Sequence, residues 1–244
     1  MVRGPAALLA GYALAFVYFL VAPHLPALPA GDGATAAADG VGLAILGACA
    51  VGLVGARRDW GVLGLLALGG GILGGALRAA HVGPGADIFQ VMLCAAAGML
   101  FARILAAPQA LVAVPVVVAG IDAWSVFSGP SASLIRHQPG VTDFLTLQLP
   151  EWGRARTGQL GISDLVFLSC YAAWAWDFGL RRALTGLCLV GALVAAVILE
   201  IALGRAIPVL PLLAVAFLAP NLDRILRLLR EERPAEGRAR PAGG

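Results

Sequence analysis

The stretch ALTGLCLVGALVAAVILEIAL, residues 183–203, carries one charged side chain, Glu200, in a run of almost entirely apolar residues. A helix needs about 20 such residues to cross the hydrocarbon of a bilayer. In a membrane, lipid solvates the apolar side chains while the helix satisfies its own backbone hydrogen bonds. The stretch therefore predicts a transmembrane helix, and it sets the scale on which the rest of the chain is read.

Further segments of the same character are spread along the 244 residues. They lie at approximately 6–23, 40–56, 60–79, 86–105, 108–128, 160–180 and 206–220. Hydrophobic residues make up 60% of the chain and charged residues 13%, whereas an average soluble domain carries about 25% charge. We therefore expect an all-α integral membrane protein, a polytopic bundle of about 8–9 transmembrane helices.

Three connecting parts differ from these spans. Residues 24–39 are rich in proline and glycine, which predicts an irregular loop. Residues 129–159 are polar, and the loose alternation at 144–149 favours a short strand or hairpin. Residues 221–244 combine arginine and glutamate with a final Pro/Gly stretch, which predicts a disordered tail.

The chain thus divides into an N-terminal transmembrane scaffold (1–107), a transmembrane region with the polar loop (108–220) and the tail. All 17 basic residues are arginine, a bias typical of GC-rich prokaryotic genomes. With a cytoplasmic N-terminus and eight spans, most arginines and the tail fall inside, as the positive-inside rule requires. We expect a multi-pass protein of a prokaryotic cell (plasma) membrane, in contact with the lipid bilayer. A homo-oligomer remains open, and the net charge of +3 is too thinly spread for a nucleic-acid surface.

Acidic residues inside apolar spans are the first functional candidates, because a charge within a membrane is costly. Asp122 precedes the polar loop and Asp164 follows it, so both lie on the order of 6–9 Å below the same membrane face. Antiparallel neighbours can therefore bring the two carboxylates together. Asp177 is roughly 20 Å further along its helix, and we interpret it as a helix-end partner of Arg181 or Arg182.

Two facing carboxylates share one proton and titrate as a coupled pair. Such a pair activates water in aspartic proteases, but facing acids also serve proton-coupled transport. The segment PVLP, at 208–211, enters the membrane from the same face. Its prolines leave backbone groups unpaired, which indicates either a kinked span start or amides that hold a substrate strand by main-chain pairing.

These segments, in this order, resemble the motifs of the GxGD-type intramembrane aspartyl proteases, the family of presenilin and signal peptide peptidase. ID at 121–122 resembles the (Y/F)D motif, GISD at 161–164 the GxGD motif, and PVLP the P-A-L motif. The resemblance covers roughly residues 108–220. The sequence departs from the family pattern at Ile121, Ser163 and Val209, where the family has an aromatic residue, glycine and alanine.

The resemblance implies a presenilin-like fold with a catalytic dyad, Asp122 and Asp164, that acts without a metal or another cofactor. It assigns the substrate-binding part of the site to Gly161, Ser163, Pro208, Val209, Leu210 and Pro211. It also implies that the substrates are transmembrane helices of other proteins, or remnant signal peptides. Such a helix must unwind locally, because its hydrogen-bonded backbone shields the peptide carbonyls.

Three other interpretations stay open. A proton-coupled transporter would use Asp122, Asp164 and Glu200 as a relay. A catalytically inactive relative would bind helices without cutting them. A prepilin peptidase also uses two membrane aspartates, but it would carry its GxGD near a cytoplasmic loop and lack the proline motif, so it fits less well. The histidines offer no metal-ligand spacing, and no metal is expected.

Overall fold

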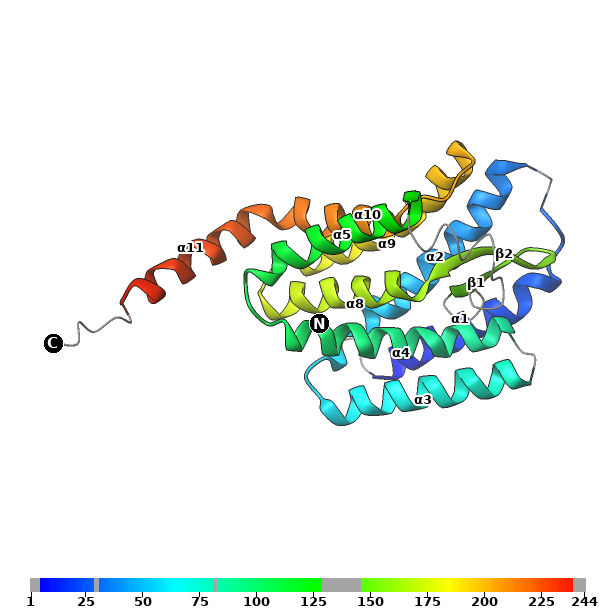
Figure 1. The fold of residues 1–244 in the computed structure, drawn as a ribbon. Coiled ribbons are helices and arrows are strands. Elements are labelled where there is room, and N and C mark those ends of the chain that lie inside the picture. Colours follow the sequence, from blue (N-terminus) through cyan, green and yellow to red (C-terminus); the bar gives the residue numbers. More distant parts are fainter. Residues whose placement is uncertain (1–4, 29–30, 81–82, 129–145, 239–244) are drawn as a thin grey trace.

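The computed structural model describes residues 5–28, 31–80, 83–128 and 146–238, and most of them are helical (Figure 1). The helices are α1 (Pro5–Val21), α2 (Asp32–Leu53), α3 (Trp60–Ala79), α4 (Gly83–Ile104), α5 (Ala110–Ser128), α8 (Ile162–Asp177), α9 (Arg182–Leu203), α10 (Val209–Leu218) and α11 (Leu222–Arg238). Short 3-10 turns continue three of them: η1 (Ala22–His24), η2 (Val54–Ala56) and η3 (Ala219–Asn221).

Six of these helical segments are long and apolar enough to cross a membrane. They are Asp32–Ala56, Trp60–Ala79, Ala86–Ile104, Ala110–Ser128, Arg182–Leu203 and Val209–Glu231. Each of the eight predicted spans corresponds to a helix, although α1 and α8 are shorter than these six. The prediction of a helical, multi-pass membrane protein is confirmed at this level.

Two predictions about the connections are wrong. The loop expected at 24–39 ends early, because α2 begins at Asp32 and its alanine-rich first turns favour helix. The tail expected to be disordered from residue 221 is instead helical through α11, where apolar residues recur every three or four positions and Ile225 is fully buried. Residues 239–244 lie outside the described part of the chain.

A two-stranded antiparallel sheet interrupts the helical bundle. Strand β1 (Thr146–Glu151) pairs with β2 (Arg154–Gly161), with Thr146 opposite Gly161 and Leu149 opposite Gly158. The predicted hairpin is confirmed for this part of the polar loop, whereas residues 129–145, including the first two of the alternating stretch 144–149, lie outside the described residues. Leu147 and Leu149 are buried and hold the sheet against α2 and α4.

Helix α8 lies at the centre of the bundle, in contact with α2, α4, α9 and α10. Its Tyr171 stacks on Phe217 of α10, with ring centroids 5.0 Å apart, and its Trp174 donates a hydrogen bond of 3.0 Å to the Ala102 carbonyl of α4. The backbones of α4 and α8 come so close at Gly98 that an added Cβ would lie 2.1 Å from the Val166 carbonyl oxygen. Small residues permit such close helix packing in membranes.

Figure 1 shows the hairpin at one end of the bundle, while α11 projects from the other end. At the hairpin end, α5 finishes, α8 begins directly after β2, and α10 begins after the turn that follows α9. The segments that carry the predicted site residues therefore share one end of the bundle.

Candidate active site

Asp122 lies near the end of α5 and is half-buried. Its Oδ2 accepts a hydrogen bond of 3.0 Å from the backbone N–H of Leu210, 88 positions later in the chain. The N–H of Val209 also interacts with this carboxylate. The first and third predicted motifs are thus joined by a direct contact between a side chain and a helix terminus.

The sequence around α10 explains why these amides are available. Pro208 precedes the helix with extended backbone (φ −65°, ψ 124°), and Val209 and Leu210 are its first two residues. The first N–H groups of any helix have no partner within it. Pro211 in the next position has no N–H at all. Asp122 therefore supplies from α5 the acceptor that α10 lacks, and its negative charge is favoured by the positive end of the helix dipole.

Asp164 lies in the first turn of α8, and its side chain is buried with 6% of the residue exposed. Strand β2 ends at Gly161, where the backbone turns directly into the helix (φ −61°, ψ 135°). A Cβ on Gly161 would lie 3.0 Å from Oδ2 of Asp164. The close approach at Gly161 is thus to the carboxylate of its own motif.

The two aspartates are close enough for their carboxylates to interact electrostatically. The sequence predicts that the helices of Asp122 and Asp164 pack directly against each other as antiparallel neighbours. In the structure α5 packs mainly on α10, and α10 in turn contacts α8. The N-terminus of α10 is therefore an integral part of the site.

The predicted substrate-binding residues differ in how deeply their side chains are buried. Pro208 and Leu210 are buried, whereas Val209, Pro211 and Gly161 are half-buried. Ser163 is exposed on the first turn of α8. The residue that replaces a family glycine therefore does not point into the packed interior.

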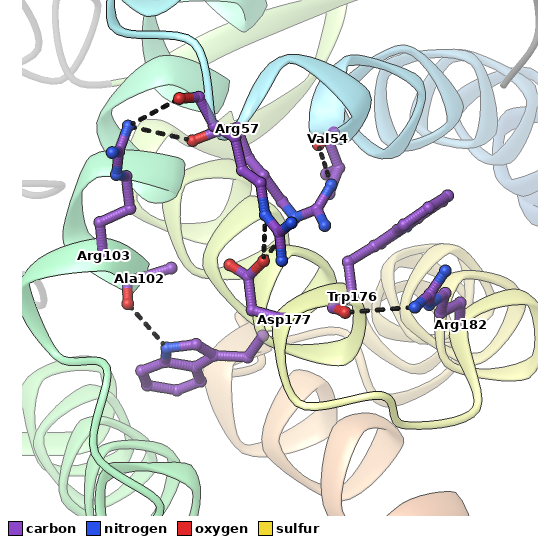
Figure 2. A network of polar contacts seen from close by, with 9 residues as sticks. Val54, Arg57, Ala102, Arg103, Trp176, Asp177 and Arg182 are labelled. Carbon is purple, nitrogen blue, oxygen red and sulfur yellow. Dashed lines mark hydrogen bonds and ion pairs between the residues drawn. The ribbon is translucent and has the colours of Figure 1, made fainter.

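Glu200 is exposed near the end of α9. Asp177 lies at the far end of α8 and pairs with Arg57, from Nε to Oδ1 at 2.8 Å, and more loosely with Arg58 at 3.5 Å (Figure 2). The prediction that it pairs with Arg181 or Arg182 is therefore wrong. Those positions are close in sequence, but Arg181 instead pairs with Asp223 at the start of α11.

Sequence reasoning missed a polar network beneath the hairpin. Arg78, at the end of α3, donates to Asp87 (3.1 Å), to Gln90 (2.8 Å) and to the Thr146 carbonyl of β1 (3.3 Å). Asp87 is 1% exposed. Arg78 lies at the end of the predicted span 60–79, and Asp87 lies at the start of the next predicted span, 86–105. An arginine and an acid at adjoining ends of two consecutive spans could have indicated this ion pair.

A second missed acid, Asp39, is buried in α2 beside β2, where a Cβ on Gly158 would lie 3.0 Å from its Oδ1. Position 39 falls in the loop predicted at 24–39, and an acid in a loop is not a candidate for a membrane site. Glycine at position 158 lets the strand approach this carboxylate closely. The hairpin that leads into Asp164 is therefore fixed on its inner side by contacts to α2, α3 and α4.

Comparisons with protein-family models, with curated proteins and with solved structures gave no match. The chemical capacity of the site therefore rests on its own residues. It combines two interacting carboxylates, one buried and one half-buried, with backbone amides at a helix start. Such a pair can hold one proton between its members and exchange it with a bound molecule.

Proposed function

We propose that this chain is an intramembrane aspartyl protease with a presenilin-like arrangement of helices, which cuts transmembrane helices or signal peptides in a prokaryotic cell membrane. The observation that carries the proposal is the hydrogen bond from the Leu210 N–H to Asp122. It links the PVLP segment to the first aspartate, while the second aspartate interacts with the first through its charge. The three motifs of the resemblance thus meet at one end of the bundle.

In the proposed mechanism the pair begins with one ionised and one protonated carboxyl. Asp122, half-buried and stabilised by the α10 amides, takes a proton from water as the water oxygen attacks the scissile carbonyl carbon. Buried Asp164 gives its proton to the carbonyl oxygen, which yields a tetrahedral diol. Asp164 then recovers a proton from a diol hydroxyl, the C–N bond breaks, and the nitrogen takes the proton held by Asp122.

The substrate is proposed to bind as a locally extended strand. An intact helix hides its carbonyls within its own hydrogen bonds, so cleavage requires unwinding. The hairpin leads directly into the turn before Asp164, and a strand edge can pair with an extended peptide. Pro208 and Pro211 interrupt the regular helical hydrogen bonding at the start of α10. We expect the unwound substrate segment to lie between the hairpin and this helix start.

The proposal is tested by the cleavage of a model transmembrane-helix peptide by purified protein in lipid. Wild type is expected to release two products, and Asp122→Ala and Asp164→Ala are each expected to release none. Glu200→Ala serves as the matched control, because it removes an exposed acid at the same end of the bundle and should still cut. A wild type that cuts nothing but moves protons across liposomes, with transport lost in Glu200→Ala, would replace the protease with the transporter.

A further inference from the structure

A cavity lined by charged residues lies at the end of α8 opposite to Asp164. Its volume is about 570 Å³, and it is bordered by the turn between η2 and α3 and by the ends of α4 and α8. The lining residues are Arg57, Arg58, Ala102, Arg103, Ala106, Trp174, Asp177 and Phe178. Three positive charges therefore face one negative charge in this cavity, part of which is drawn in Figure 2.

The three arginines differ in how far contacts within the protein balance their positive charge. Arg57 is buried, and its Nε donates to Asp177 at 2.8 Å, so its charge is largely balanced. Arg58 has 76% of its side chain exposed and reaches Asp177 only at 3.5 Å. Arg103 makes long contacts of 3.4 Å to the carbonyls of Arg57 and Arg58. Arg58 and Arg103 thus hold positive charge that the cavity itself does not neutralise.

The aromatic residues at this end indicate the depth of the cavity in the membrane. Trp60 begins α3 with 62% exposure, and the Arg103 guanidinium lies 3.9 Å from the centroid of its ring. Tryptophan is enriched where hydrocarbon meets the headgroups. Arginines at the ends of apolar helices reach the same level. The cavity therefore opens at headgroup depth, on the arginine-rich side that the positive-inside rule assigns to the cytoplasm.

We propose that this cavity binds the phosphate of an anionic phospholipid, with Arg58 and Arg103 as its ligands. Guanidinium groups bind phosphate through paired N–H donors, and the cytoplasmic leaflet supplies such lipids at this depth. The Arg57–Asp177 pair fixes the floor of the site without neutralising the other two arginines. The inference does not depend on the proposed protease activity.

The test measures lipid retained by the whole protein after purification from mixed vesicles of phosphatidylglycerol and phosphatidylcholine. Native mass spectrometry of wild type is expected to show bound phosphatidylglycerol in preference to phosphatidylcholine. Arg58→Gln with Arg103→Gln should reduce that preference about thirtyfold, since each arginine near the surface contributes about a fivefold factor. Arg227→Gln is the control, because this exposed arginine of α11 does not line the cavity.

Two further arms identify the ligand and guard against misfolding. Arg58→Gln alone changes a largely exposed side chain, so it should fold normally and still lose about fivefold in preference. Inorganic phosphate at millimolar concentration should neither displace the lipid nor raise the unfolding temperature. Equal retention in the double variant and Arg227→Gln would overturn the proposal. Displacement by inorganic phosphate would also overturn it, by showing a general anion site.

Discussion

Replacing Gly98 by alanine is expected to destabilise the bundle, because this glycine lies where the backbones of α4 and α8 come close together. The new Cβ would lie 2.1 Å from the Val166 carbonyl oxygen and 2.9 Å from Cβ of Ser169. Ordinary contact begins near 3.4 Å, so α4 and α8 would have to separate locally by about 1.3 Å, an overpacking that typically costs about 1–3 kcal/mol. Because both helices are central, we expect a value at the upper end of that range.

The matched control is Gly191→Ala in α9, where the added Cβ meets no atom within 4 Å. Alanine is the better helix former by about 1 kcal/mol, so this variant should be as stable as wild type or slightly more stable. Thermal unfolding in detergent, followed by tryptophan fluorescence, compares the two, since Trp174 is buried at the α4–α8 contact. Equal unfolding temperatures for Gly98→Ala and wild type would refute the close packing of these helices.

Further variants probe the polar contacts beneath the hairpin and at the opposite end of the bundle. Arg78→Ala removes an ion pair to Asp87, which is 1% exposed, and a hydrogen bond to the Thr146 carbonyl, and should lower stability by about 1.5–3 kcal/mol in chemical denaturation. Equal stability of Arg78→Ala and wild type would contradict a contribution of this ion pair to the fold. Asn221→Ala removes buried hydrogen bonds to Thr185 (2.7 Å) and to the Phe217 carbonyl (2.8 Å), and should lower stability by about 1–3 kcal/mol. Thr185→Val should show a smaller loss in the same assay, and a larger one would contradict the central position of Asn221.

The sequence predicted the helices well, because their defining signal is local. Runs such as 183–203 need only their own apolar side chains and internal hydrogen bonds to form a membrane helix. The shared end of Asp122, Asp164 and the PVLP segment also followed from counting spans, since helix direction alternates with each crossing. These features depend on chain length and alternation, which a sequence displays directly.

The contacts between helices were less accessible. Helix α10 packs against α5, and the Leu210 amide donates to Asp122. This contact depends on packing between segments 88 positions apart, which no local pattern displays. The pairing of Asp177 with Arg57 was missed for a similar reason, because nearer arginines in the sequence suggested a local partner. Helix α11 was not predicted because the many charged residues of this segment indicated disorder. Its apolar residues nevertheless form one face of a helix, on which Ile225 is buried.

The most direct test of the central claim is the binding of a photoreactive peptide that carries a hydroxyl group in place of the scissile carbonyl, an analogue of the tetrahedral diol. The two-carboxylate account predicts that wild type is labelled, that Asp122→Asn and Asp164→Asn each lose labelling, and that Glu200→Gln keeps it. Labelling that persists unchanged in both aspartate variants would show that these carboxylates do not form a peptide-hydrolysing site.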